Sequence, residues 1–158
     1  MSLFETTSAA ATMALAEKLM QKWLQLYGAE NCFVVLLTGD YGAGKTHFVK
    51  GAAKGAGVLN EIVSPSYVYI REYSFKYNER VGNFVHVDAW RLKTEQDLRD
   101  IGLEKYIRHG NIIVMEWGGL LSKDLVNLPK LVKIDVKITE VADGKRHIAV
   151  EESRGWNE

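Results

Sequence analysis

The chain has 158 residues, of which 47% are hydrophobic and 25% are charged, so it is long enough to bury the core of one compact domain. We expect a single domain over residues 1–158. The 20 basic and 20 acidic residues give a formal net charge of zero, which excludes a surface that attracts nucleic acid or anionic membrane as a whole. No strong direct binding of nucleic acid is therefore expected.

An amphipathic helix is predicted between Ser8 and Tyr27. Apolar side chains recur there at spacings of three and four, Ser8 is suited to cap the N-terminus, and Gly28 follows the last turn. The run from Cys32 to Thr38 is apolar and rich in branched residues, which predicts a strand covered on both faces, as in the parallel sheets of α/β proteins. A helix is then predicted from Lys45 to Ala56.

The second half of the chain alternates short strands with one helix. We expect the helix from Thr94 to Ile107, with Thr94 as its N-cap. The predicted strands are Tyr67 to Phe75, Asn83 to Val87, Asn111 to Met115, Leu131 to Thr139 and Arg146 to Val150, of which the last two form a hairpin. Together these elements predict a single-domain α/β fold of three layers, with a mostly parallel central sheet and a C-terminal antiparallel hairpin.

The sequence also bears on the compartment. Cys32 is the only cysteine, so no disulfide forms within the chain, and a reducing environment is expected. The longest unbroken apolar run, Cys32 to Leu37, is far shorter than the roughly 18 residues that indicate a membrane span. Glu5, and no basic residue, precedes the first apolar segment, which argues against a secretory signal. These features predict a cytoplasmic protein without a membrane association.

A glycine-rich loop joins the first predicted strand to the next helix. Gly39, Gly44, Lys45 and Thr46 fit the pattern GxxxxGK(S/T), the P-loop. Glycines let the backbone curl so that successive N–H groups face one phosphate, and the helix that begins near Lys45 adds its positive end. Lys45 can reach the β- and γ-phosphates, and the Thr46 hydroxyl can join a Mg²⁺ shell. Because the loop lies between a strand and a helix, we predict a P-loop NTPase fold that binds ATP or ADP with Mg²⁺, rather than a turn that binds nothing.

Two carboxylates stand at the ends of predicted strands. Asp88 follows the strand that ends at Val87, and Glu116 follows the strand that ends at Met115. The carboxyl ends of parallel strands share one edge with the P-loop, so both side chains are expected to face the nucleotide rather than to be simple solvated strand ends. Either can bind the metal or orient an attacking water.

Further side chains near the predicted site are candidates. We expect His86 to point away from the face of Asp88 and to be a core histidine or one that supports the site. A hydroxyl of Ser64 or Ser66 can sense the γ-phosphate, as switch loops do, although a plain turn explains "SPS" equally well. No NKxD element is present to read guanine, which favours adenine. Thr12 and Lys145 are candidates for the adenine pocket, with a purely scaffolding role as the alternative.

Four motifs in this order, "GDYGAGKT", "SPSY", "HVDAWRL" and "EWGG", resemble the TsaE (YjeE) family of small bacterial P-loop ATPases. The similarity covers nearly the whole chain. It implies an ATPase that acts in making threonylcarbamoyladenosine in transfer RNA, that binds the TsaD and TsaB proteins, and whose hydrolysis supports their turnover. Ser66 stands where the family usually has threonine, Trp90 where tyrosine is common, and Gly118 where proline is common.

Carried over by position, the resemblance implies a role for each motif residue. Asp40 to Thr46 become the phosphate loop, Thr46 and Glu116 the metal ligands, and Asp88 an acidic group of the hydrolytic site. Taken with the chemistry of the residues themselves, the expected catalytic groups are Lys45, Asp88 and Glu116. The loop Ser64 to Tyr67 becomes a switch-like segment, and Trp117 the aromatic residue of the "EW" motif. The expected nucleotide contacts are Gly39, Asp40, Tyr41, Gly42, Ala43, Gly44, Lys45, Thr46, His47, Ser66, Thr12 and Lys145.

Two activities fit the sequence. The first is a Mg²⁺-dependent ATP hydrolase, slow without partner proteins because no arginine is placed as a finger. The second is a small kinase that transfers the γ-phosphoryl group to a small molecule. A kinase needs an arginine-rich lid, whereas the arginines here, Arg71, Arg80, Arg91, Arg99 and Arg108, are scattered along the chain. The sequence therefore favours the hydrolase.

Overall fold

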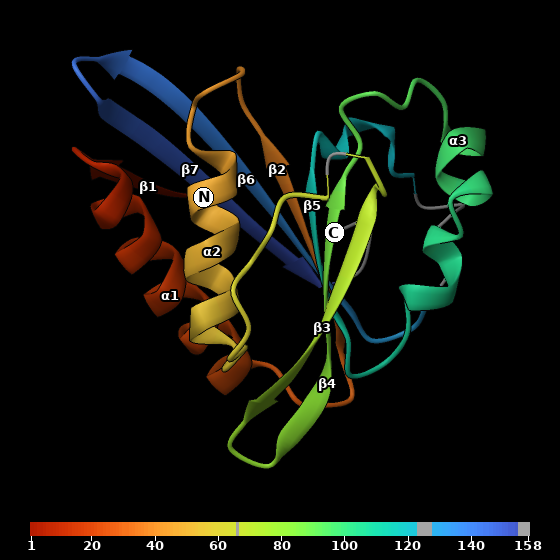
Figure 1. Ribbon diagram of the computed structural model, residues 1–158. Helices are drawn as coiled ribbons and strands as arrows, with labels where there is room; N and C mark the ends of the chain where they lie inside the picture. The colour runs from red at the N-terminus through yellow and green to blue at the C-terminus, as the bar shows by residue number, and fades with distance from the viewer. Residues whose placement is uncertain (66, 123–127, 155–158) are drawn as a thin grey trace.

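The computed structural model describes residues 1–65, 67–122 and 128–154. These residues form a seven-stranded sheet in the order β1-β7-β6-β2-β5-β4-β3, with helices on both faces (Figure 1). The strands are β1 (Ser2–Thr6), β2 (Cys32–Thr38), β3 (Ile70–Tyr77), β4 (Arg80–Asp88), β5 (Ile112–Glu116), β6 (Leu131–Ala142) and β7 (Lys145–Arg154). The helices are α1 (Ala9–Leu26), α2 (Lys45–Gly55) and α3 (Glu95–Asp100), with 3₁₀ turns η1 (Leu103–Tyr106) and η2 (Gly118–Leu120).

The centre of the sheet is parallel, and its margins are antiparallel. Strands β6, β2, β5 and β4 run parallel to one another, whereas β3 pairs antiparallel with β4, and β7 with both β6 and β1. This confirms the predicted α/β fold with a mostly parallel centre. The predicted C-terminal hairpin is also confirmed, and its first strand, β6, lies parallel beside β2.

Strand β2 is buried on both faces, which explains its continuous apolar sequence. Phe33, Val35 and Leu37 pack in the cluster formed with α1 and α2, and the alternate side chains of the strand pack in the cluster that includes Leu98 of α3 and Leu103 of η1. Figure 1 shows these three layers, with α1 and α2 on one side of the sheet and α3 on the other. A strand with this burial cannot carry the alternating polar pattern of a half-exposed strand.

Helices α1 and α2 pack against each other through two glycines of α2. A Cβ added to Gly51 would lie less than 3.0 Å from the backbone of Met13, and one added to Gly55 would meet the backbone of Glu17 in the same way. Such distances are shorter than any ordinary carbon contact, so only glycine allows this approach. The close packing fixes α2 on α1, with the first turn of α2 at the carboxyl end of β2. Ser8 caps α1 as predicted, since its side chain accepts the N–H of Ala11 at 3.0 Å.

The ends of most predicted elements shift by a few residues, and three further differences have a physical reason. The helix expected from Thr94 to Ile107 is interrupted, because Gly102 adopts a left-handed φ of 80° that ends α3 before η1 begins. Strand β3 begins at Ile70 rather than Tyr67, after Tyr69 with its positive φ of 63°. Strand β1 was not predicted, since its five residues become a strand only by pairing with β7, which lies far away in the sequence. No helix in the described parts of the chain is long and apolar enough to cross a bilayer.

Candidate nucleotide-binding site

The P-loop runs from the end of β2 to the start of α2 and lies at the top of Figure 1. Gly39, Gly42 and Gly44 have φ values of 152°, 79° and 107°, a region that side-chain-bearing residues rarely adopt. A Cβ on Gly39 would also lie 2.5 Å from the carbonyl oxygen of Ile138 in β6. The glycine spacing of the motif is therefore needed both for the curl of the loop and for its packing on the neighbouring strand.

Lys45 is buried inside the loop. Its Nζ donates hydrogen bonds of 2.8 Å to the carbonyls of Gly39 and Asp40, and it lies 4.2 Å from the centre of a ring of Trp117. Burial lowers the pKa of the ammonium, while the nearby carboxylates of Glu116, Asp88 and Asp40 act in the opposite direction. The loop's own carbonyls thus hold the lysine that the P-loop motif assigns to phosphate.

A chain of polar contacts runs from α2 along one face of the sheet. The Thr46 hydroxyl donates to Oε1 of Glu116 at 3.1 Å, and Oε2 of Glu116 lies 2.7 Å from Nε2 of His86. Glu116 is 4% exposed and His86 is fully buried. The expectation that His86 points away from Asp88 is wrong, because residues two apart in a strand share a face. His86, Asp88 and Glu116 all lie on the same face of neighbouring strands.

Asp88 lies beside Glu116, because the two residues are paired in the register of β4 and β5. Burial raises the pKa of the Asp88 carboxyl, and the charge of Glu116 adds to this effect, whereas the hydrogen bond of 3.2 Å from the Trp90 N–H opposes it. The two strand-end carboxylates therefore meet at the P-loop edge of the sheet, as the parallel arrangement predicts.

A cavity of about 510 Å³ opens between these elements. Its walls come from the P-loop, from the segments after β4 and β5, from the loop before β3 and from β7. Two exposed aromatic residues, Tyr67 and Trp90, stand at the cavity with Arg91, whose guanidinium lies 5.2 and 4.9 Å from the centres of their rings. The lining residues are Tyr41, Gly42, Gly44, Lys45, Thr46, His47, Ser64, Tyr67, Asp88, Trp90, Arg91, Glu116, Trp117 and Arg146.

Sequence reasoning missed Arg146 in this cavity. Its Nε donates to the P-loop carbonyl of Ala43 at 3.0 Å, and its Nη1 donates to Gly144 at 3.0 Å. The side chain thereby ties the β6–β7 hairpin to the P-loop and brings a cation to the cavity. Its neighbour Lys145, from the same turn, was the residue predicted from the sequence. Adjacent side chains of a strand point to opposite faces, so only one of the two can face the cavity, and in the structure that residue is Arg146.

The remaining predicted residues lie as follows. Gly39, Asp40 and Ala43 belong to the P-loop without lining the cavity, and Ser66 is outside the described residues. Thr12 is buried, with its hydroxyl 2.8 Å from that of Thr6, and Lys145 pairs with Glu5 at 3.3 Å. Neither lines the cavity, so their contact with adenine stays a prediction.

Two of the five arginines considered for a kinase lid, Arg80 and Arg99, make their polar contacts away from the P-loop cavity. Arg80 donates to the carbonyls of Gly28 and Asn31 at the opposite end of β2, and Arg99 pairs with Glu95 and Glu104. In the described parts of the chain, Arg91 and Arg146 are the arginines that line the cavity. Two arginines from separate elements do not make the arginine-rich lid of a kinase.

Thr46 and Glu116 have the chemistry of Mg²⁺ ligands. Mg²⁺ prefers oxygen donors, and it binds proteins through one or two carboxylates together with phosphate oxygens and water. The hydroxyl and the carboxylate already meet at 3.1 Å beside the P-loop, and the second oxygen of Glu116 is held by His86. The described residues contain no group of three His, Cys, Asp or Glu that would bind a metal without such phosphate ligands. The residues therefore fit a magnesium ion that arrives with a nucleotide.

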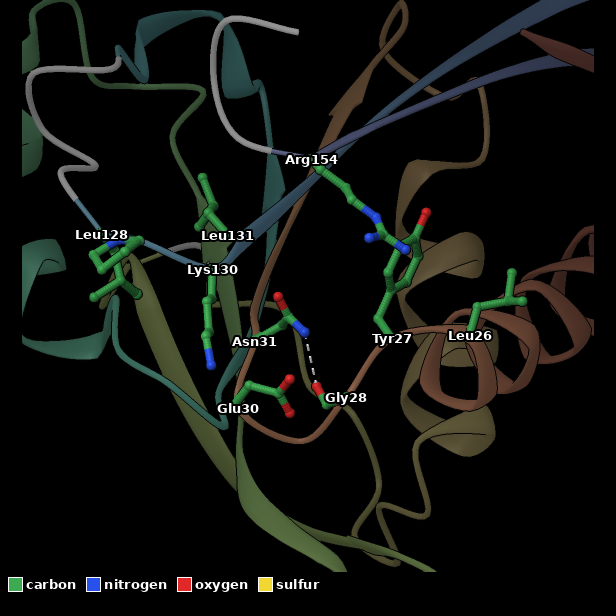
Figure 2. Close-up of a pocket in the computed structure, with 10 residues that line it drawn as sticks. Leu26, Tyr27, Gly28, Glu30, Asn31, Leu128, Lys130, Leu131 and Arg154 are labelled. Atoms are coloured by element: carbon green, nitrogen blue, oxygen red, sulfur yellow. Dashed lines mark hydrogen bonds between the residues drawn. The ribbon is translucent and has the colours of Figure 1, made fainter.

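A second cavity, of about 590 Å³, lies at the opposite end of the sheet (Figure 2). It is lined by the end of α1 and by the residues that precede β2 and β6, with Glu30 and Lys130 on its walls and Arg154 beside Tyr27. Ligands of open parallel sheets bind at the carboxyl ends of the strands, and this cavity lies at the amino ends. The P-loop cavity is therefore the better candidate for the functional site.

Comparison with known proteins finds a matching family model and similar sequences. The family model described as "Threonylcarbamoyl adenosine biosynthesis protein TsaE" matches residues 6–148. The tRNA threonylcarbamoyladenosine biosynthesis protein TsaE of Bacillus subtilis is 33% identical over 73% of this chain and 66% of its own length. The protein of the same name from Treponema pallidum is 34% identical over 74% of this chain and 80% of its own length.

The fold has a similar solved structure, that of YdiB from Bacillus subtilis. It superposes with a TM-score of 0.66 and 25% sequence identity, over 98% of this chain and 86% of that one. The family match spans the segments that carry the P-loop, Asp88 and Glu116. On these grounds the chain belongs to the TsaE family of threonylcarbamoyl adenosine biosynthesis proteins.

Proposed function

We propose that this protein binds ATP or ADP together with Mg²⁺, hydrolyses ATP, and thereby supports the formation of threonylcarbamoyladenosine in tRNA by acting on a TsaD–TsaB complex. The pathway follows from family membership. The hydrolase activity is supported by one observation above others, the contact between Thr46 of the P-loop and Glu116 at the tip of β5. P-loop NTPases hold their metal with a P-loop hydroxyl and a strand-end carboxylate, and a contact between two such groups supports the same role here.

The P-loop binds the phosphates through its main-chain N–H groups and the start of α2. The ammonium of Lys45 exchanges its two loop carbonyls for phosphate oxygens, which form stronger, charge-assisted hydrogen bonds. Thr46 and Glu116 would hold Mg²⁺, which would supply positive charge to offset the negative charge of the phosphates.

Asp88 is the group that orients the attacking water in this proposal. Both carboxylate oxygens of Glu116 already have partners, Thr46 and His86, whereas Asp88 accepts one backbone N–H through Oδ1 and lines the cavity. The pKa of Asp88 is raised, which moves it toward the range of a useful general base. Asp88 therefore suits the proton-accepting role better than Glu116 does.

The test is phosphate release from ATP, measured with and without the TsaD–TsaB pair. We expect a slow rate for the protein alone, a faster rate with the pair, and loss of both in Lys45→Ala and Glu116→Ala variants that keep the parent's circular dichroism. An unchanged rate and no detectable complex with the pair would contradict the proposed partner. Variants that bind and hydrolyse ATP like the parent would contradict the proposed site.

A second incubation distinguishes the hydrolase from the kinase alternative. With γ-labelled ATP and a metabolite extract, a hydrolase places the label only in inorganic phosphate. Label in a new phosphoester would show transfer to an acceptor and would overturn the proposed reaction.

A further inference from the structure

We infer that His86 is a positioning residue for magnesium, because it holds Glu116 in the orientation that presents one carboxylate oxygen to Thr46 and the metal. The inference rests on the proposed function, since it concerns the same metal-nucleotide site. It gives a definite role to a side chain for which the sequence left open a place in the core or a supporting place at the site.

The sheet itself fixes the geometry of the pair. His86 is paired with Val114 in the register of β4 and β5, and Asp88 is paired with Glu116, so His86 and Glu116 are diagonal neighbours on one face. Both strands are central and buried, and neither end of the contact lies on a loop. Functional groups supported by rigid elements hold their geometry better than groups on loops.

The hydrogen bond has a defined direction. A carboxylate only accepts, so the hydrogen lies on Nε2 of His86, which is 2.7 Å from Oε2 of Glu116. The other ring nitrogen, Nδ1, is buried and has no hydrogen-bond partner within the described ranges. Glu116 is thus the polar group that fixes the ring, and the ring in turn fixes Glu116.

This arrangement divides the two oxygens of Glu116 between two tasks. Oε2 accepts the hydrogen bond from His86, while Oε1 accepts the hydrogen bond from the Thr46 hydroxyl at 3.1 Å. Without His86, the carboxylate would lose a buried partner and could rotate away from Thr46. Groups that orient a metal ligand in this way are worth about 10- to 100-fold in metal affinity.

The experiment measures the Mg²⁺ concentration needed for half-maximal tightening of ADP binding, by calorimetry. In His86→Leu, which removes the donor at similar volume, we expect a requirement about 10- to 100-fold higher than in the parent. His86→Gln, whose amide can place a donor near the position of Nε2, should lie close to the parent. Affinity for ADP in EDTA should be the same in all three proteins, because the P-loop is untouched.

A merely structural role gives a different pattern. It would lower the unfolding temperature of His86→Leu and leave the Mg²⁺ requirement unchanged, and this result would overturn the inference, as would an equal defect in His86→Gln. If His86→Leu does not fold, His86→Asn replaces it, since its amide lies too near the backbone to reach Oε2. A parent that binds ADP without any Mg²⁺ dependence would refute the proposed metal site as well. A parent that shows the dependence, with variants that do not differ from it, would refute only the role of His86.

Discussion

Replacing Gly51 with alanine tests how closely the P-loop helix lies against α1. The added Cβ would lie 2.8 Å from both the carbonyl carbon and the Cα of Met13, and still closer to the carbonyl oxygen. These are backbone atoms, so no side chain can rotate away to make room. The helices must instead move apart, which would loosen the contact on which the position of α2 depends.

The magnitude follows from two opposing effects. Overpacking of a tight contact costs about 1–3 kcal/mol, and a rigid backbone obstacle belongs at the upper end of that range. Alanine has a higher helix propensity than glycine, which adds roughly 1 kcal/mol to the stability of the folded protein. The net expectation is a loss of about 2 kcal/mol, which lowers the melting temperature of a domain of this size by roughly 4–8 °C.

The assay is thermal unfolding followed by circular dichroism, with Gly119→Ala as the matched control. Gly119 is exposed, and a Cβ added there meets nothing within 4 Å, so its replacement should change the stability by less than about 0.5 kcal/mol. The reasoning is refuted if Gly51→Ala melts at the same temperature as Gly119→Ala or above it.

Three further changes have defined outcomes. Asp88→Asn should lower ATP hydrolysis by about 10²- to 10⁴-fold. In protein without metal or nucleotide, Asp88→Asn should also raise the melting temperature at pH 7. Because the pKa of Asp88 is raised in the folded state, its ionisation lowers the stability of the folded protein as the pH rises above the unfolded pKa. The advantage of the variant should therefore vanish near pH 3, and an advantage that does not change with pH would contradict the raised pKa. Arg146→Ala should weaken ADP binding roughly 10-fold by releasing the Ala43 carbonyl, whereas equal binding in fluorescence titration would exclude a role for this contact. Gly39→Ala should abolish nucleotide binding, since its Cβ would lie 2.5 Å from the Ile138 carbonyl oxygen; retained calorimetric binding would show that the loop adapts.

The sequence predicted those features whose causes are local. The apolar run of β2, the glycine spacing before Lys45 and the carboxylates after β4 and β5 each follow from neighbouring residues, and the structure places them at one edge of the sheet. Ser8 and Thr94 were found as helix caps for the same reason, because a cap bonds within its own first turn.

Features that depend on distant parts of the chain were missed. Arg146 reaches Ala43 across 103 residues of sequence; the turn beside it was expected near the P-loop edge, but Lys145 was chosen there instead of Arg146. Gly51 was not singled out from the sequence, because only the packing of α1 against α2 shows why glycine is needed there. The position of His86 was different, because the period of a strand was enough to place it on the face of Asp88, and that rule was misapplied.

The most direct test of the central claim is calorimetric titration of the parent protein with ADP, in the presence and absence of Mg²⁺. The geometry of the P-loop, Thr46 and Glu116 predicts one nucleotide per chain, with tighter binding when Mg²⁺ is present. Folded protein that gives no heat of binding with either ADP or ATP, with Mg²⁺ present, would contradict it.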